Sequence, residues 1–270
     1  MTNRVRRLLV LSLAVPSLTC VMVWTVSWAA PADSTAIPRD MVPIEQGQYL
    51  SLFKQEGTNQ EVSVPAFYLD KYQVTNAEYL EFTERFDQWS KANIKPIFAD
   101  KTYMAHFAEN DIGEIADQPV VNVSWFAARA YCKAQDKRLP TLDEWEYVAR
   151  ASASDIDGTQ SVEYREKILQ WYSKPATEQR PNVKDTEPNY WGVHGMHGVV
   201  WELVNDFNTA LVTGESRGDS TLDNQLFCGA GSASSVDPSD YAAFMRFALR
   251  SSYSSNYTLN SLGFRCAKDK

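Results

Sequence analysis

The segment PVVNVSWFAARAYCKAQDKRLPTLDEWEYVARA (residues 119–151) constrains the fold most, because it contains two helix starts in close succession. Ser124 can cap a helix that runs through Cys132 or slightly beyond. After Pro140, Thr141 and Glu144 form a capping box that opens a second helix. Residues 120–123 favour a short strand before the first helix. We therefore expect short helices and strands that follow one another closely.

An earlier segment has the same character. Residues 63–74 (SVPAFYLDKYQV) mix aromatic and β-branched residues and predict a strand pair, or a strand and a bend. Thr75 and Glu78 form another capping box, and aromatic residues recur at helical spacing from Tyr79 to Trp89. That stripe predicts a helix face in the core. Further along, a helix is expected near residues 162–171 within a polar stretch, and GFRCA near the end predicts a closing strand.

The first thirty residues form a unit of their own. A basic start is followed by a long apolar run, and Ser27 to Ala29 supplies the small residues that a signal peptidase reads. We expect residues 1–30 to be a cleaved signal peptide and residues 31–40 a linker. The alternative is an uncleaved anchor, which would be the only membrane contact. Either case predicts a periplasmic or otherwise exported protein.

Charge and cysteine content narrow the function further. The 270-residue chain has a net charge of −8 and no lysine- or arginine-rich run, so nucleic-acid binding is not expected. Beyond residue 30 the cysteines are Cys132, Cys228 and Cys266. In an oxidising compartment this odd number predicts one disulfide and one remaining thiol.

Several of these segments together resemble the sulfatase-modifying factor family, the domain of the formylglycine-generating enzymes. The similar pieces, which occur in the family's order over residues 41–268, are MVPIEQGQY, FYLDKYQVTNAEYLEF, residues 119–151, GVHGMHGVVWELVND, and RSS followed by NSLGFRCA. The resemblance implies a single, irregular α/β domain of the α+β kind, related to the C-type-lectin-like fold.

The resemblance also implies where an active site would lie. Family enzymes oxidise a substrate cysteine to formylglycine with copper held by two cysteines, but no cysteine lies between Cys228 and Cys266 here. Hydroxyls do not replace soft thiolates as ligands of Cu(I). We therefore expect no formylglycine-generating activity by the family mechanism. The residues in the corresponding region, and so the remaining catalytic candidates, are Ser232, Ser234, Ser235, Tyr241 and Arg246.

Two further features follow from the resemblance alone. It implies a disulfide between Cys132 and Cys266, which leaves Cys228 as the odd thiol. It also implies calcium, for which the oxygen-bearing candidates are Asn182, Asp185 and Glu202.

The stretch GVHGMHGVVWEL (residues 192–203) holds two of the chain's three histidines. Its three glycines argue against a helix, and no HExxH motif is present. His194 and His197 are therefore either turn residues or, with Cys228 or His106, ligands of copper or iron. A Ser-His-Asp hydrolase built from Ser232 or Ser234, His197 and Asp206 lacks the G-x-S-x-G spacing.

Arg246 and Arg250 would share a face if their segment is helical, and could hold a carboxylate or a peptide. The alternative is internal ion pairing in this acidic chain.

These observations favour an exported accessory, maturation or regulatory module that binds a periplasmic protein partner. The chain resembles the accessory proteins encoded beside copper nitrite reductases, which would make that partner a metalloenzyme, and regulators of secretion-system kinase pathways. The alternatives are a metal-dependent oxidoreductase with a site relocated to His194, His197 and Cys228, and a carbohydrate-binding role suggested by fold analogy.

Overall fold

A computed structural model describes residues 40–51, 61–107, 112–173, 180–206, 245–246, 249–250 and 254–270. Residues 37–270 belong to one compact unit, in agreement with a single domain. Among the described residues, no helix combines the length and the apolar character needed to cross a membrane.

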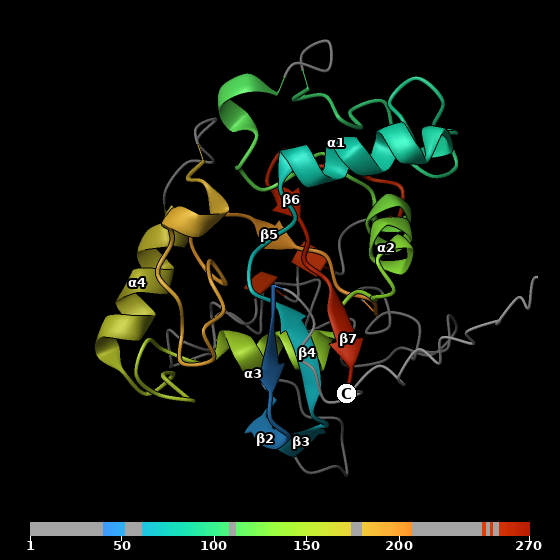
Figure 1. Ribbon diagram of the computed structural model, residues 1–270. Coiled ribbons are helices and arrows are strands. Elements are labelled where there is room, and N and C mark those ends of the chain that lie inside the picture. Colours follow the sequence, from blue (N-terminus) through green and yellow to red (C-terminus); the bar gives the residue numbers. More distant parts are fainter. Residues whose placement is uncertain are drawn as a thin grey trace, which may run out of the picture. The chain divides into compact units, whose positions relative to one another are not determined.

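The strands are short and form three small sheets, shown in Figure 1. In the first sheet a central strand pairs antiparallel with a strand on each side, so that the end of the chain lies beside an early segment. The second sheet is an antiparallel hairpin and the third a parallel pair. In that order the strands are β1 (Met41–Ile44), β4 (Phe67–Asp70) and β7 (Ala267–Asp269); β2 (Gly47–Leu50) and β3 (Glu61–Val64); β5 (Trp201–Glu202) and β6 (Leu262–Gly263).

The helices are also short. The α-helices are α1 (Asn76–Arg85), α2 (Trp125–Ala134), α3 (Leu142–Ala149) and α4 (Val162–Ser173), and the 3₁₀ turns are η1 (Asp87–Trp89), η2 (Gly113–Ile115) and η3 (Val183–Asp185). Both predicted capping boxes are present. In α3 the Glu144 amide donates to Thr141 Oγ1 at 3.2 Å, and the Thr141 amide donates to the Glu144 carboxylate at 2.8 Å. Thr75 and Glu78 make the same pair of bonds at α1, and Ser124 caps α2.

Two expectations need correction. Residues 120–123 are buried but form no strand, because Asn122 adopts a positive φ of 51° that interrupts the extended backbone. Asn122 instead donates its amide to Leu259 O at 2.9 Å. The predicted strand pair near residue 63 consists of β3 and β4, but each pairs with a different strand.

Aromatic side chains fill the core between α1, α2 and the C-terminal segment. The ring of Tyr79 on α1 stacks on Tyr131 of α2 with centroids 5.9 Å apart, and Phe264 meets both rings edge-on. On the other side, α3 packs on the β2–β3 hairpin. Gly47 lies against Tyr147 there: a Cβ at that position would lie 2.1 Å from Tyr147 Oη, so the tyrosine side chain would have to move.

Candidate functional site

The glycine-rich stretch before β5 is a turn, as its sequence predicts. Gly192, Gly195 and Gly198 all have positive φ, between 64° and 94°. At Gly195 a side chain would also collide with its surroundings, because a Cβ would lie 2.9 Å from the Gln73 amide nitrogen. The turn therefore presents His194 and His197 without the fixed spacing of a helix.

The two imidazoles are held by different segments. His194 donates from Nδ1 to Thr186 O at 2.5 Å, and its ring lies 4.7 Å from the ring of Tyr72. His197 donates from Nε2 to Ala149 O at 2.8 Å, beside the Tyr164 hydroxyl at 3.2 Å. Since a carbonyl only accepts, these contacts fix which nitrogen carries the proton in each ring.

The environment of His197 keeps its ring neutral. Burial, together with the positive charge of Arg246, lowers the pKa of His197 to about 3. Its Nδ1 is buried and has no hydrogen-bond partner among the described residues. A neutral imidazole with one free nitrogen is the form that binds metals. No group of three His, Cys, Asp or Glu side chains arranged to hold a metal ion occurs in the part of the chain that the structure describes.

The other proposed ligands do not complete such a set. His106 lies next to α1, where its Nε2 is 2.8 Å from Asn76 Oδ1. Cys228 lies outside the described residues, so a relocated metal site stays a prediction.

The Glu202 carboxylate is the centre of a buried polar network. It accepts four hydrogen bonds of 2.8 to 2.9 Å, two from Arg265 and one each from Trp145 Nε1 and Gln73 Nε2. Both Glu202 and Arg265 have fully buried side chains. The four donors occupy the lone pairs of the carboxylate, so its oxygens are not open to calcium. Calcium binding by the Glu202 side chain stays a prediction, which this geometry does not favour.

The remaining calcium candidates lie at η3. The Asn182 amide donates to Asp185 Oδ2 at 3.0 Å, and Asp185 is exposed. One carboxylate turned toward an amide nitrogen is far from the six to eight oxygen ligands that calcium takes. These two residues alone supply no calcium site.

Arg246 and Arg250 are used for internal ion pairing. Both contact Glu146 on α3, at 2.6 Å and 2.8 Å, and all three side chains are buried. The Arg250 guanidinium also lies 4.4 Å from the ring centroid of Trp145. The two cations outweigh the cost of burying the carboxylate and lower the pKa of Glu146 to about 2. These ion pairs therefore leave neither guanidinium free for a substrate carboxylate.

The histidine and aspartate of the hypothetical hydrolase do not form a relay. Asp206 accepts the backbone amide of Leu142 at 2.7 Å, while the protonated nitrogen of His197 faces Ala149 O. A relay needs that nitrogen to face the carboxylate. Ser232, Ser234, Ser235 and Tyr241 lie outside the described residues.

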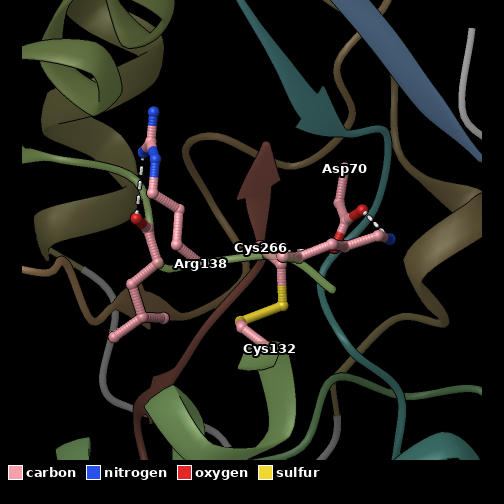
Figure 2. The surroundings of a disulfide bond; sticks show 6 residues. Asp70, Cys132, Arg138 and Cys266 are labelled. Carbon is pink, nitrogen blue, oxygen red and sulfur yellow. Dashed lines mark hydrogen bonds and ion pairs between the residues drawn. A yellow bond between two sulfur atoms is a disulfide. The ribbon is translucent and has the colours of Figure 1, made fainter. Parts of the chain in front are cut away.

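Two cysteines are bonded to each other. A disulfide joins Cys132, in α2, to Cys266, the residue before β7, as the family resemblance implies. Figure 2 shows this bond beside Asp70, which accepts the Cys266 amide at 2.9 Å. Neither sulfur is then available as a thiolate, so the family's pair of copper-binding thiolates does not fit this chain.

The partners of Glu202 were not found from the sequence. Trp145 and Gln73 are far from Glu202 along the chain, and nothing in their local pattern indicates a shared contact. One signal in the sequence could have suggested a buried ion pair: two opposite charges lie within otherwise apolar stretches, Arg265 in GFRC and Glu202 in VWEL.

Short α and β elements around a buried Glu–Arg pair, with the last strand placed next to β4, define an irregular α+β domain. The chain matches the model of the sulfatase-modifying factor enzyme 1-like domain over residues 28–270. It therefore belongs to the sulfatase-modifying factor family.

The similar proteins include formylglycine-generating enzymes as well as a member named inactive. The chain is 25% identical over 304 aligned residues to the formylglycine-generating enzyme of Bos taurus, covering 89% of this chain and 78% of that protein. It is 26% identical over 253 residues to inactive C-alpha-formylglycine-generating enzyme 2 of the same species, covering 78% and 80%. Among solved structures, CarF is similar with a TM-score of 0.48 and 16% identity, covering 87% of this chain and 100% of the other.

Proposed function

We propose that this protein is an exported accessory or regulatory module that binds a protein partner and does not generate formylglycine. The cysteine inventory carries the proposal. The chain has four cysteines. Cys20 belongs to the N-terminal apolar run, and Cys132 is bonded to Cys266. Cys228 alone is left, and one thiolate cannot provide the two-sulfur set that holds Cu(I).

The kind of partner follows from the resemblance and the expected compartment. The N-terminal segment favours export, and the similarity to accessory proteins of copper nitrite reductases favours a periplasmic metalloenzyme as the partner. A relative that covers 78% of this chain is itself named inactive, which supports a family role without the oxidation chemistry.

The catalytic half of the proposal is tested with a cysteine-containing peptide, oxygen and Cu(I)-loaded protein. Formylglycine formation replaces the cysteine side chain with an aldehyde, and mass spectrometry detects it directly. We expect unchanged peptide, with an active family enzyme as the positive control. Conversion of the peptide at a rate comparable with the control would refute this half.

The partner half is tested by photo-crosslinking in the producing cell, with the crosslinker placed at single exposed positions of the domain. We expect a discrete crosslinked species, obtained from neighbouring positions only and containing one exported protein. An absence of any position-specific product would contradict a binding role.

The alternative, a metal-dependent oxidoreductase, is favoured by one observation: the buried Nδ1 of His197 has no hydrogen-bond partner among the described residues. The test is the copper and iron content of protein purified without chelator. Stoichiometric metal that is lost in a His194→Ala, His197→Ala double variant would support this alternative over the accessory role.

A further inference from the structure

A groove of about 720 Å³ lies along α1. Its walls come from α1, the turn between β4 and α1, the end of α2, and residues near η3. Its volume falls in the range of small-ligand sites. None of the residues discussed so far as catalytic or metal-binding candidates lines it.

Tyr131 of α2 lines this groove. The residue is only 6% exposed, and its ring packs against Phe82 and Phe264 with centroids 5.3 Å and 5.4 Å away. Its hydroxyl oxygen makes no hydrogen bond within the described residues and is not among their fully buried, unpartnered atoms. This hydroxyl is thus an unused polar group in the groove wall.

Three carboxylates of the groove lie close enough to Tyr131 to act on its hydroxyl. Burial and the nearby negative charges of Glu78, Asp70 and Glu81 raise the pKa of Tyr131, and all three acidic residues line the groove. Asp70 is neutralised by Lys137 at 2.6 Å. Glu78 uses one oxygen for the α1 capping box. Glu81 is exposed and forms no ion pair within the part of the chain that the structure describes.

Of the four cations that line the groove, Lys137 forms an ion pair with a carboxylate near Tyr131. Lys137 is committed to Asp70, and Lys268 pairs with Asp136 outside the groove at 2.7 Å. Arg85 lies over the Phe86 ring, 5.3 Å from its centroid. Among the groove-lining carboxylates around Tyr131, only Asp70 has a cation within ion-pair distance.

We propose that this groove binds an alkylammonium group, which either a free amine or a lysine side chain can supply. The ammonium has three donors, and Glu81, Glu78 and the Tyr131 hydroxyl offer three acceptors. The alkyl chain would lie against the Phe82 and Tyr131 rings, which favour cations and methylene groups alike. The proposal rests on the groove and is independent of the accessory role.

The test is calorimetric titration of the purified full-length protein with 1,5-diaminopentane and, separately, with a short lysine-containing peptide. Glutarate, of similar length but opposite charge, is the control ligand. We expect binding of an amine. Glu81→Gln should weaken it about tenfold, because the charged acceptor becomes a neutral one, and Tyr131→Phe by several-fold, because it removes one acceptor. Glu81 is chosen over Glu78 because Glu78 also caps α1.

Glu84→Gln is the matched control, because Glu84 is an exposed residue of the same helix that does not line the groove. It should leave the affinity unchanged. Binding of the diamine indicates a free amine as the source, and binding of the peptide alone indicates a partner's lysine; both support the site. Failure of both amines to bind, equal weakening by Glu84→Gln, or no effect of Glu81→Gln and Tyr131→Phe would overturn it.

Discussion

At the scale of single residues, the buried carboxylates of Glu202 and Glu146 are each met by several donors or counter-charges. The Glu202 carboxylate has four donors, and Glu146 has two guanidinium groups. Burying a charge without such partners costs several kcal/mol. The same side chains use their bonding capacity inside the domain, so the calcium and substrate roles expected for them stay predictions.

His197 gives a pH prediction at this scale. Its pKa is about 3 in the folded protein, below the usual value of 6.5. The unfolded chain therefore takes up a proton below pH 6.5, and the folded protein does so only near pH 3. The stability present above pH 6.5 is lost as the pH falls through this window, by about 1.4 kcal/mol per pH unit for one proton.

A His197→Gln variant, which keeps a donor for Ala149 O, should lack this contribution. Urea unfolding of both proteins between pH 7 and pH 4 measures it. The stability difference between wild type and variant should shrink as the pH falls. A difference that stays constant over this range would show that His197 takes up its proton equally in both states.

At the scale of elements, local hydrogen bonds define where the helices begin. Thr75, Ser124 and Thr141 each accept from an amide in the first turn of their helix. Helices of eight to ten residues are not stable alone in water, so the caps act together with the packing of one buried face.

Removal of one cap should therefore weaken the domain without abolishing the fold. We expect Thr141→Ala to lower the free energy of unfolding by about 1 kcal/mol, because the Glu144 amide loses its side-chain acceptor. Thr141→Ser retains a hydroxyl and should recover most of the loss. Denaturant midpoints give the comparison; equal losses in both variants would mean that the methyl group, not the cap, is responsible.

At the scale of the whole molecule, the disulfide and the β4–β7 pairing connect segments that are distant in the chain. Cys132 and Cys266 are separated by 134 residues. Cross-linking a loop of that length restricts the unfolded chain and stabilises the fold by about 5 kcal/mol.

A Cys132→Ala, Cys266→Ala double variant should lose a stability of that order and should no longer respond to reductant. Wild-type protein unfolded in dithiothreitol should approach the variant. The measurement is the urea midpoint with and without reductant. If the disulfide is shown to be reduced and the urea midpoint of the wild type does not change, the disulfide does not supply this stability.

The sequence by itself determined the helices and the family. Each helix start depends on a cap residue whose bonding partner lies three residues further on, and each buried face depends on apolar residues at helical spacing. Both patterns are local. It also determined that a copper-binding pair of cysteines is missing. Residues 120–123 show the limit of local patterns: four residues that favour a strand are bent at Asn122.

Only the tertiary structure decided which groups meet. Gln73, Trp145 and Arg265 reach Glu202 across as many as 129 residues of chain, and the groove at Tyr131 combines several elements. Local residue patterns carry no information about such contacts. They exist because packing brings the elements together and because each buried charge must be neutralised where it then lies.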